Sequence, residues 1–119
     1  KFDGSFVGCI KKANNSAVTL VNLIATEFSC FNDVVSFEER ECVKFLKRAQ
    51  ICVADIWAAF EGDKYGSFFD IDKITIFADY RIPQILNELG CMSYSPPLEN
   101  VIRKKILIES GHNWEIQIR

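Results

Sequence analysis

Three adjacent polar residues in the middle of an apolar stretch carry the side chains best suited to chemistry. Asp79, Tyr80 and Arg81 supply a carboxylate, a phenol and a guanidinium, and isoleucine, leucine and phenylalanine flank them on both sides. Such a cluster has two interpretations. Either an Asp–Arg pair pins the corner between two helices while the tyrosine packs, or the three side chains line a pocket. The residues alone leave both interpretations open.

Lys47 is the second candidate, because it lies at the edge of the apolar stripe of a predicted helix. Leu46 belongs to that stripe, and the next residue of an α-helix is about 100° further round. A lysine in this position usually covers apolar surface with its methylene groups and extends its ammonium group to solvent. The alternative is that Lys47 points into the same cavity as Asp79.

Other reactive side chains are few and scattered. The chain has one histidine, His112, and five cysteines that form no CxxC pair. The sequence therefore offers few His and Cys ligands at the spacing of a zinc site, and we expect no metal. An odd number of widely spaced cysteines predicts buried, reduced thiols in a cytoplasmic protein and argues against a disulfide framework.

Composition and charge narrow the class of protein. The 119 residues are 49% hydrophobic and 25% charged, which is typical of one globular domain. The net charge of -2 provides little electrostatic attraction for the phosphates of a nucleic-acid polymer. No uninterrupted apolar stretch approaches the roughly 20 residues that a membrane span needs. We therefore expect neither a nucleic-acid polymer nor a membrane as a partner.

The two ends of the sequence suggest a larger context. Residue 1 is Lys, and the chain stops at Arg119 just as a new apolar alternation begins with Trp114, Ile116 and Ile118. We expect residues 1–119 to form a single helical domain that is an incomplete central portion of a longer enzyme.

Apolar residues recur at helical spacing almost throughout, which predicts an all-α, multi-helix bundle with short connections. Asn15 or Ser16 is expected to cap the second helix. Ser36, with Glu39 three residues later, matches a capping box that opens the longest helix. The expected helices cover residues 6–12, 18–28, 36–62, 74–78, 83–90 and 95–109.

The helices around the Asp79 cluster are predicted from their flanking residues. Asp70 or Asp72 is placed to cap the short helix before the cluster. Pro83 suits the first turn of the next helix. Because a residue before proline favours an extended backbone, Ile82 is expected to break the chain immediately after Arg81.

Several segments together resemble one protein family. The segment "KRAQICVADIWAAFEG" at 47–62 and the segment "FFDIDKITIFADYRIPQILNELG" at 68–90 carry the most specific motifs, KRAQ and FADYRIPQ. The stretches "ANNSAVTLVNLIATEF" and "VSFEERECVKFLKRAQ" extend the similarity. Together they resemble the queuosine salvage protein family, the queuosine 5'-phosphate N-glycosylase/hydrolases. Members of that family are considerably longer than this chain.

The resemblance implies an all-helical fold, similar in layout to helical DNA glycosylases, and an activity. That activity is hydrolysis of queuosine 5'-monophosphate to queuine and ribose 5-phosphate, without a metal or organic cofactor. It serves the salvage of queuine for tRNA modification. Breaking an N-glycosidic bond builds oxocarbenium character on the ribose, as in O-glycoside cleavage. Queuine is a 7-deazaguanine and has no N7 to protonate, so the site must depend more on stabilising the ribosyl cation.

The same resemblance implies roles for five residues. Asp79 is the expected nucleophile or cation stabiliser. Lys47 is expected to keep Asp79 ionised or to help hold the 5'-phosphate. Tyr80 and Phe77 are expected to stack on the base or shape its pocket. Arg81 is expected either to bind the phosphate or to pin the corner.

Two other functions stay open. One is a glycosylase that acts on a base within DNA or RNA, which the lack of a basic surface disfavours. The other is a non-catalytic helical interaction module, in which the Asp79 cluster is only a corner. The implied partner is a small-molecule nucleotide, and the sequence indicates no oligomeric state.

Overall fold

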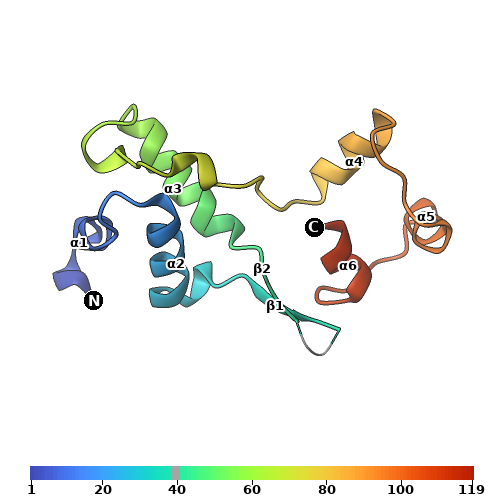
Figure 1. Cartoon of the computed structure of the whole chain (residues 1–119). Helices are drawn as coiled ribbons and strands as arrows, with labels where there is room; N and C mark the ends of the chain where they lie inside the picture. Colours follow the sequence, from blue (N-terminus) through green and yellow to red (C-terminus); the bar gives the residue numbers. More distant parts are fainter. Residues whose placement is uncertain (39–40) are drawn as a thin grey trace. The chain divides into compact units, whose positions relative to one another are not determined.

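The computed structural model describes residues 1–38 and 41–119, and its helices confirm the predicted helical class (Figure 1). The α-helices are α1 (Phe6–Lys12), α2 (Ala17–Glu27), α3 (Lys47–Ala59), α4 (Arg81–Glu88), α5 (Pro96–Arg103) and α6 (Asn113–Ile118). The short 3-10 helices are η1 (Phe2–Gly4), η2 (Ser29–Phe31), η3 (Lys64–Gly66) and η4 (Ile71–Lys73). The strands β1 (Val34–Phe37) and β2 (Glu41–Lys44) pair as a two-stranded sheet.

The described chain divides into two compact units. Unit 1 comprises residues 1–34 and 44–77, and unit 2 comprises residues 35–43 and 78–119. Each unit is described by itself below. The expectation that residues 1–119 form a single domain stays a prediction.

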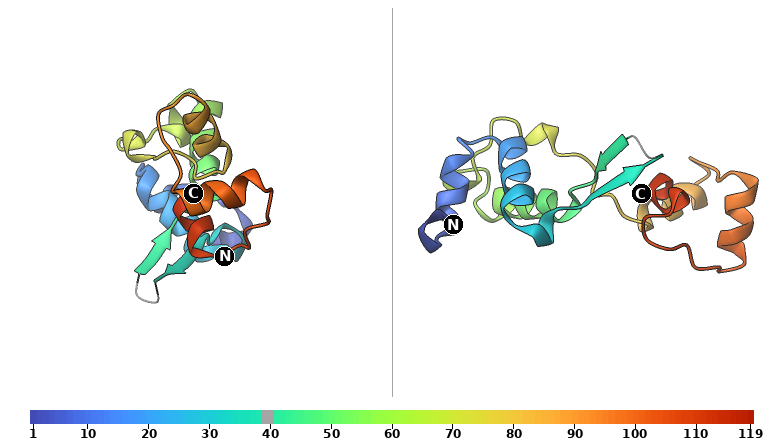
Figure 2. Two further views of the ribbon diagram at one scale, coloured as in Figure 1. Left: turned by 90° about the vertical axis from the view of Figure 1, so that its right-hand side faces the viewer. Right: turned by 90° about the horizontal axis from the view of Figure 1, so that it is seen from below.

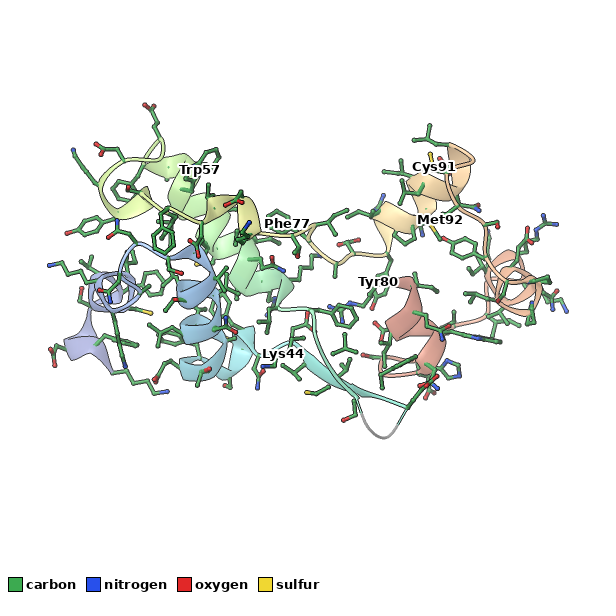
Figure 3. The ribbon with its side chains drawn as sticks, in the orientation of Figure 1. Lys44, Trp57, Phe77, Tyr80, Cys91 and Met92 are labelled. Atoms are coloured by element: carbon green, nitrogen blue, oxygen red, sulfur yellow. The ribbon has the colours of Figure 1, made fainter. Side chains whose placement is uncertain are left out.

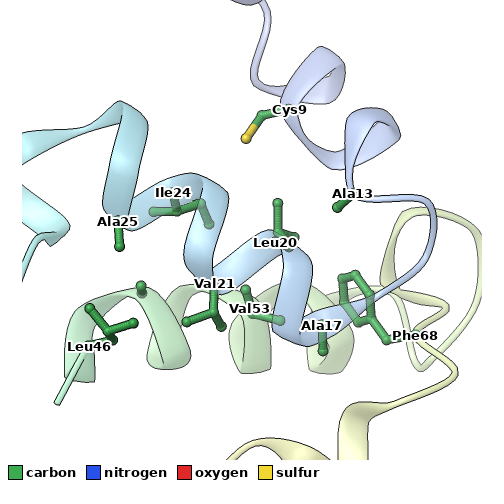
Figure 4. Packing of buried hydrophobic residues seen from close by; sticks show 11 residues of the cluster. Cys9, Ala13, Ala17, Leu20, Val21, Ile24, Ala25, Leu46, Val53 and Phe68 are labelled. Carbon is green, nitrogen blue, oxygen red and sulfur yellow. The ribbon is translucent and has the colours of Figure 1, made fainter. Parts of the chain in front are cut away.

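Unit 1 is built around α2, which packs against both α1 and α3 (Figures 1 and 2). Its apolar face is dense enough to be covered on two sides, as the sequence predicts. Leu20, Ile24 and Val53 are the largest side chains that are fully buried there. The buried cluster comprises Cys9, Ala13, Ala17, Leu20, Val21, Ile24, Ala25, Leu46, Ala49, Val53 and Phe68 (Figure 4).

The start of α2 is capped from two places in the sequence. Ser16 is the N-cap, as predicted, and its hydroxyl accepts a hydrogen bond from the Thr19 N–H at 3.0 Å. The same hydroxyl donates to an Asp70 carboxylate oxygen at 2.8 Å, and the Ala17 N–H donates to the other oxygen. Asp70 was expected to cap a local helix over 74–78, and that expectation is wrong, since its carboxylate caps α2 instead.

The predicted helix over residues 36–62 begins later than expected. Ser36 lies in β1, so it does not open a helix, and Glu39 lies outside the described residues. Valine and phenylalanine in this stretch favour strands. Leu46 then adopts a left-handed backbone, with φ 49°, as the N-cap of α3. The longest described helix does lie in the predicted region, but it spans only the 13 residues of α3.

The boundaries of the later helices also differ from the expectations. The predicted helix at 74–78 is absent, because residues 74–79 have no regular secondary structure. Helix α4 already starts at Arg81, so Ile82 is helical and the predicted chain break after Arg81 is wrong. The irregular segment instead ends before Arg81, within the Asp79 cluster. Helix α5 ends at Arg103 and not near Glu109.

The apolar alternation at 114–118 belongs to α6, not to a strand. Only one face of this short helix is covered, and Glu115 and Ile116 are its buried residues. Helix α6 begins after His112, whose ring accepts a hydrogen bond from the Trp114 N–H. A six-residue segment carries too few turns for its helical period to stand out against alternation.

All five cysteines are free thiols, but they are not all buried as predicted. Cys9 is buried and Cys52 partly buried, whereas Cys30, Cys42 and Cys91 are exposed. Desolvation raises the pKa of both Cys9 and Cys52 above the ordinary thiol value. None of the helices in the described ranges is long and apolar enough to cross a membrane.

Candidate functional site

A buried glutamine of α3 holds the irregular segment that leads to the Asp79 cluster. Gln50 is 8% exposed, and its side-chain oxygen accepts hydrogen bonds from the Thr75 N–H at 2.9 Å and the Thr75 hydroxyl at 3.0 Å. Its amide nitrogen donates to the Phe45 carbonyl at 3.1 Å. The last residue of the KRAQ motif therefore fixes the start of the segment from which Phe77 and Asp79 follow.

Lys47 and Phe77 both lie in unit 1 and are partly buried. Lys47 is the first residue of α3, one turn before Gln50, so its partial burial agrees with the predicted place beside the apolar stripe. Phe77 is the last residue of the unit and lies in the extended segment (Figure 3). Asp79 belongs to unit 2, and the expected approach of Lys47 to Asp79 stays a prediction.

Asp79 caps the first turn of α4. Its carboxylate oxygen Oδ1 accepts a hydrogen bond from the Arg81 N–H at 2.9 Å, and Tyr80 between them has helical dihedral angles, with φ -65° and ψ -21°. The positive end of a helix dipole stabilises a carboxylate in this position. Asp79 is partly buried and the Arg81 side chain is exposed. The contact at this corner is thus made by the Arg81 backbone, while its guanidinium points to solvent.

Tyr80 reaches α6 through its phenol. The Tyr80 hydroxyl donates a hydrogen bond of 2.7 Å to Oε1 of Glu115, whose side chain is only 4% exposed. The second oxygen, Oε2, accepts the Gly111 N–H at 3.0 Å. The guanidinium nitrogen Nη1 of Arg119 lies 3.7 Å from Oε1. Each oxygen therefore accepts one hydrogen bond, and the Arg119 guanidinium adds an ion pair to the buried carboxylate.

A pocket of about 520 Å³ lies beside this hydrogen bond, entirely within unit 2. Its volume is in the range of small-molecule sites. The lining is mostly isoleucine and leucine, with the phenol of Tyr80, the ammonium group of Lys105 and the carboxylate of Glu115 as polar groups. The lining residues are Tyr80, Ile102, Lys105, Ile106, Leu107, Ile108, Ser110, Glu115 and Ile118.

Sequence reasoning missed two residues that organise this region. Gln50 has helical spacing with the apolar residues of α3, and a glutamine at such a position indicates a side chain with hydrogen-bond partners in the interior. Glu115 lies within the apparent apolar alternation at 114–118, where a polar residue is expected to face solvent. The charged Glu115 stands between the apolar Trp114 and Ile116, which indicates that a hydrogen-bond or ionic partner accompanies its burial.

Metal ligands do not gather in the part of the chain that the structure describes: no group of three or more His, Cys, Asp or Glu side chains is placed to hold an ion.

The family model for the queuosine salvage protein matches residues 1–119, the whole length of the sequence. The chain belongs to the queuosine salvage protein family. The KRAQ and FADYRIPQ motifs, which carry the resemblance, therefore lie within a matched chain, and Gln50 and Asp79 come from those two motifs.

Individual relatives of this family agree. A protein of Schizosaccharomyces pombe named queuosine 5'-phosphate N-glycosylase/hydrolase is 48% identical over 118 residues, which cover 99% of this chain and 34% of that protein. Proteins with the same name from Bos taurus and Sphaerobacter thermophilus are 44% and 40% identical over 119 residues, or 35% and 36% of their lengths. The chain thus spans about a third of the length of the curated relatives it matches.

Proposed function

We propose that this chain is part of a longer enzyme that hydrolyses the N-glycosidic bond of queuosine 5'-monophosphate, releasing queuine and ribose 5-phosphate for salvage. The match to relatives with that name over nearly all of the chain is the observation that carries the proposal. We further propose that the reaction serves tRNA modification and takes place in the cytoplasm, where five free thiols stay reduced.

Asp79 is the proposed catalytic carboxylate. Three properties of its surroundings support this role: partial burial, a backbone N–H on one oxygen, and the positive end of α4. The N–H bond fixes the orientation of the carboxylate before substrate arrives. A preorganised negative charge of this kind stabilises a ribosyl cation without having to reorganise during the reaction.

The remaining roles follow the chemistry of each side chain. Tyr80 lines an apolar pocket and is proposed to contact the base there, with Phe77 stacking on the base or shaping its pocket. The exposed guanidinium of Arg81 suits the 5'-phosphate, because its corner contact is made by the backbone. Lys47 is proposed to keep Asp79 ionised or to assist with the phosphate.

The proposed reaction balances with water as the only co-reactant. The bond between C1' of the ribose and the ring nitrogen of queuine breaks, and its electron pair leaves with the base. A water oxygen forms the new bond to C1'. One water proton compensates the charge on the released base, and the hydroxyl stays on ribose 5-phosphate. If Asp79 acts as nucleophile, water attacks the ribosyl ester in a second step.

The decisive experiment uses the full-length protein that contains this chain. Wild type is expected to release queuine and ribose 5-phosphate in equal amounts from queuosine 5'-monophosphate. Asp79→Asn keeps the shape and one acceptor oxygen but removes the charge opposite the ribosyl cation. Single-turnover release should therefore fall by about 100- to 1,000-fold, and by more if Asp79 is the nucleophile. Equilibrium binding of the nucleotide should change much less.

Asp72→Asn is the matched control, because Asp72 is exposed and its carboxylate pairs with Lys73 at 2.8 Å. Its release rate should equal that of wild type. A thermal melt of each variant identifies losses caused by unfolding. Near-normal release by a folded Asp79→Asn protein removes Asp79 from the mechanism, and an inactive folded wild type refutes the proposed function.

A further inference from the structure

Glu115 is a buried carboxylate that the proposed reaction does not yet use. Its side chain is 4% exposed and lies in α6, whereas its partner Tyr80 precedes α4 by one residue. Removing a carboxylate from water is costly unless donors replace the lost solvation. Here the Tyr80 hydroxyl at 2.7 Å, the Gly111 N–H at 3.0 Å and the Arg119 guanidinium at 3.7 Å replace it.

A second glutamate of unit 2 shows what this arrangement adds. Glu99 also pairs with an arginine one turn later, Arg103, at 2.7 Å. The Glu99 side chain is 44% exposed and its pair is a surface ion pair, which contributes little to stability. Glu115 differs because it is buried and because it holds a phenol from another segment. Its role therefore goes beyond an ion pair along the helix.

Tyr80 links this buried carboxylate to the pocket. The tyrosine side chain is half exposed and lines the pocket of about 520 Å³. A tyrosine ring with a free hydroxyl has two torsions to lose when it orders against a ligand. The hydrogen bond to Glu115 fixes these torsions before a ligand binds.

We propose that Glu115 is a positioning residue for the base-binding pocket: its carboxylate fixes the Tyr80 phenol so that the ring presents a preorganised wall to the heterocycle of the nucleotide. This inference rests on the proposed function. In this role Glu115 acts through Tyr80 and not on the reacting atoms, although it also lines part of the pocket. Loss of Glu115 should then weaken substrate binding and leave the chemical step nearly unchanged.

The test is a double-mutant cycle in the full-length enzyme, with KM and kcat measured for queuosine 5'-monophosphate. Glu115→Ala and Tyr80→Phe each break the same hydrogen bond and should each raise KM by about 10- to 100-fold, with kcat within a few-fold of wild type. The double variant should be no worse than the poorer single variant, because the second change removes nothing further. Glu99→Ala is the matched control and should leave both constants within about twofold.

Each alternative has its own signature. If Glu115 is only structural, fewer enzyme molecules are folded, so kcat falls while KM is unchanged, and the inference is overturned. Losses in KM that multiply in the double variant also overturn it. A wild type that does not cleave the nucleotide refutes the proposed function and this inference together, whereas an active wild type with an additive cycle refutes this inference alone.

If Glu115→Ala does not fold, two milder variants test the role of Glu115. Glu115→Gln keeps an oxygen for the Tyr80 hydroxyl but turns an amide donor toward the Gly111 N–H. We expect a lower melting temperature with KM within about threefold of wild type. Tyr80→Phe should still raise KM by about 10-fold or more. An unchanged KM in a folded Tyr80→Phe protein overturns the inference.

Discussion

The two units bury apolar surface to very different degrees. Unit 1 closes α1, α2 and α3 around one contiguous cluster in which Leu20, Ile24 and Val53 are fully buried. In unit 2 the described buried apolar side chains are few, and α4, α5 and the segments that follow them leave large ones exposed. Those exposed side chains include Ile85, Leu86, Leu89, Ile102, Ile106 and Leu107. The stability of unit 1 therefore comes from packing, whereas unit 2 depends more on individual polar contacts.

Both units nevertheless use one buried polar side chain to hold an irregular segment. In unit 1 Gln50 holds Thr75, and in unit 2 Glu115 holds Tyr80. Each of these contacts joins a helix to the chain on one side of Asp79. Phe77 and Asp79 thus lie between two hydrogen-bonded positions of the chain, Thr75 with its neutral anchor and Tyr80 with its charged anchor. This arrangement allows a loop to present a carboxylate in a defined orientation.

The largest predicted effect is in the core of unit 1. Leu20→Ala removes a fully buried side chain between α1 and α3 and should cost about 3–5 kcal/mol in the free energy of unfolding. The same change at Leu107 of unit 2, which is 86% exposed, should cost less than about 0.5 kcal/mol. Urea unfolding of the 119-residue chain measures both. Equal costs would show that the contrast between the units is wrong.

The second prediction concerns the neutral anchor. Gln50→Leu keeps the volume and the burial but leaves the Thr75 N–H and the Phe45 carbonyl without their side-chain partner. The loss should be about 2–3 kcal/mol in the free energy of unfolding. Hydrogen exchange should speed up first at Thr75, because its amide proton is the one that Gln50 protects.

Gln84→Leu in α4 supplies the matched control for Gln50→Leu. Gln84 is exposed, so replacing it should change the free energy of unfolding by less than about 0.5 kcal/mol. If Gln50→Leu is as harmless as this control, Gln50 does not anchor the segment. If it is costly but exchange at Thr75 is unchanged, the cost arises at Phe45 instead.

The part of the fold that was predictable from sequence is the part with strong local signals. Helix α1 has the predicted bounds, and Ser16 caps α2 as expected, because apolar periodicity and capping chemistry agree there. The prediction failed where a helix-capping signal competed with the pairing of two consecutive strands, β1 and β2. Ser36 and the residues after it carry a plausible capping pattern, yet the strand preference of the valines around it prevailed. Strand pairing is not visible in a helical period.

The candidate site was predictable in its residue types but not in its supporting contacts. The charge of Asp79 and the phenol of Tyr80 stand out in an apolar stretch of the sequence. Their partners are the backbone of Arg81 and the carboxylate of Glu115, the latter 35 residues further along the chain. The Arg81 contact is local, whereas the long-range pair of Tyr80 and Glu115 follows from tertiary structure, and no spacing rule for a single sequence specifies it.

The smallest predicted effect is at Asp70, a polar contact inside the packed unit. Desolvation alone would raise the pKa of Asp70, but hydrogen bonds from the Ser16 hydroxyl and from the Ala17 and Val18 N–H groups outweigh it, and the pKa is lowered. The unfolded chain, with an ordinary value of about 3.9, therefore binds a proton more readily than the folded chain as the pH falls. The contribution of Asp70 is fully present at neutral pH and is lost as the pH falls through the lowered pKa.

Asp70→Asn should therefore cost about 1 kcal/mol in the free energy of unfolding at pH 7, the usual value of one helix cap, and its cost should shrink in acid. Thermal melts of both proteins from pH 7 to pH 3 measure the difference, with Asp72→Asn as a control whose carboxylate pairs with Lys73. Asp72 is exposed and pairs only with neighbouring Lys73 in the described contacts, so its replacement should change little at any pH. A constant difference between wild type and Asp70→Asn across this range would mean that the second acceptor oxygen of Asp70, and not its charge, caps α2. Convergence of the two curves in acid would show that even the well-packed unit relies on one charged contact to begin its central helix.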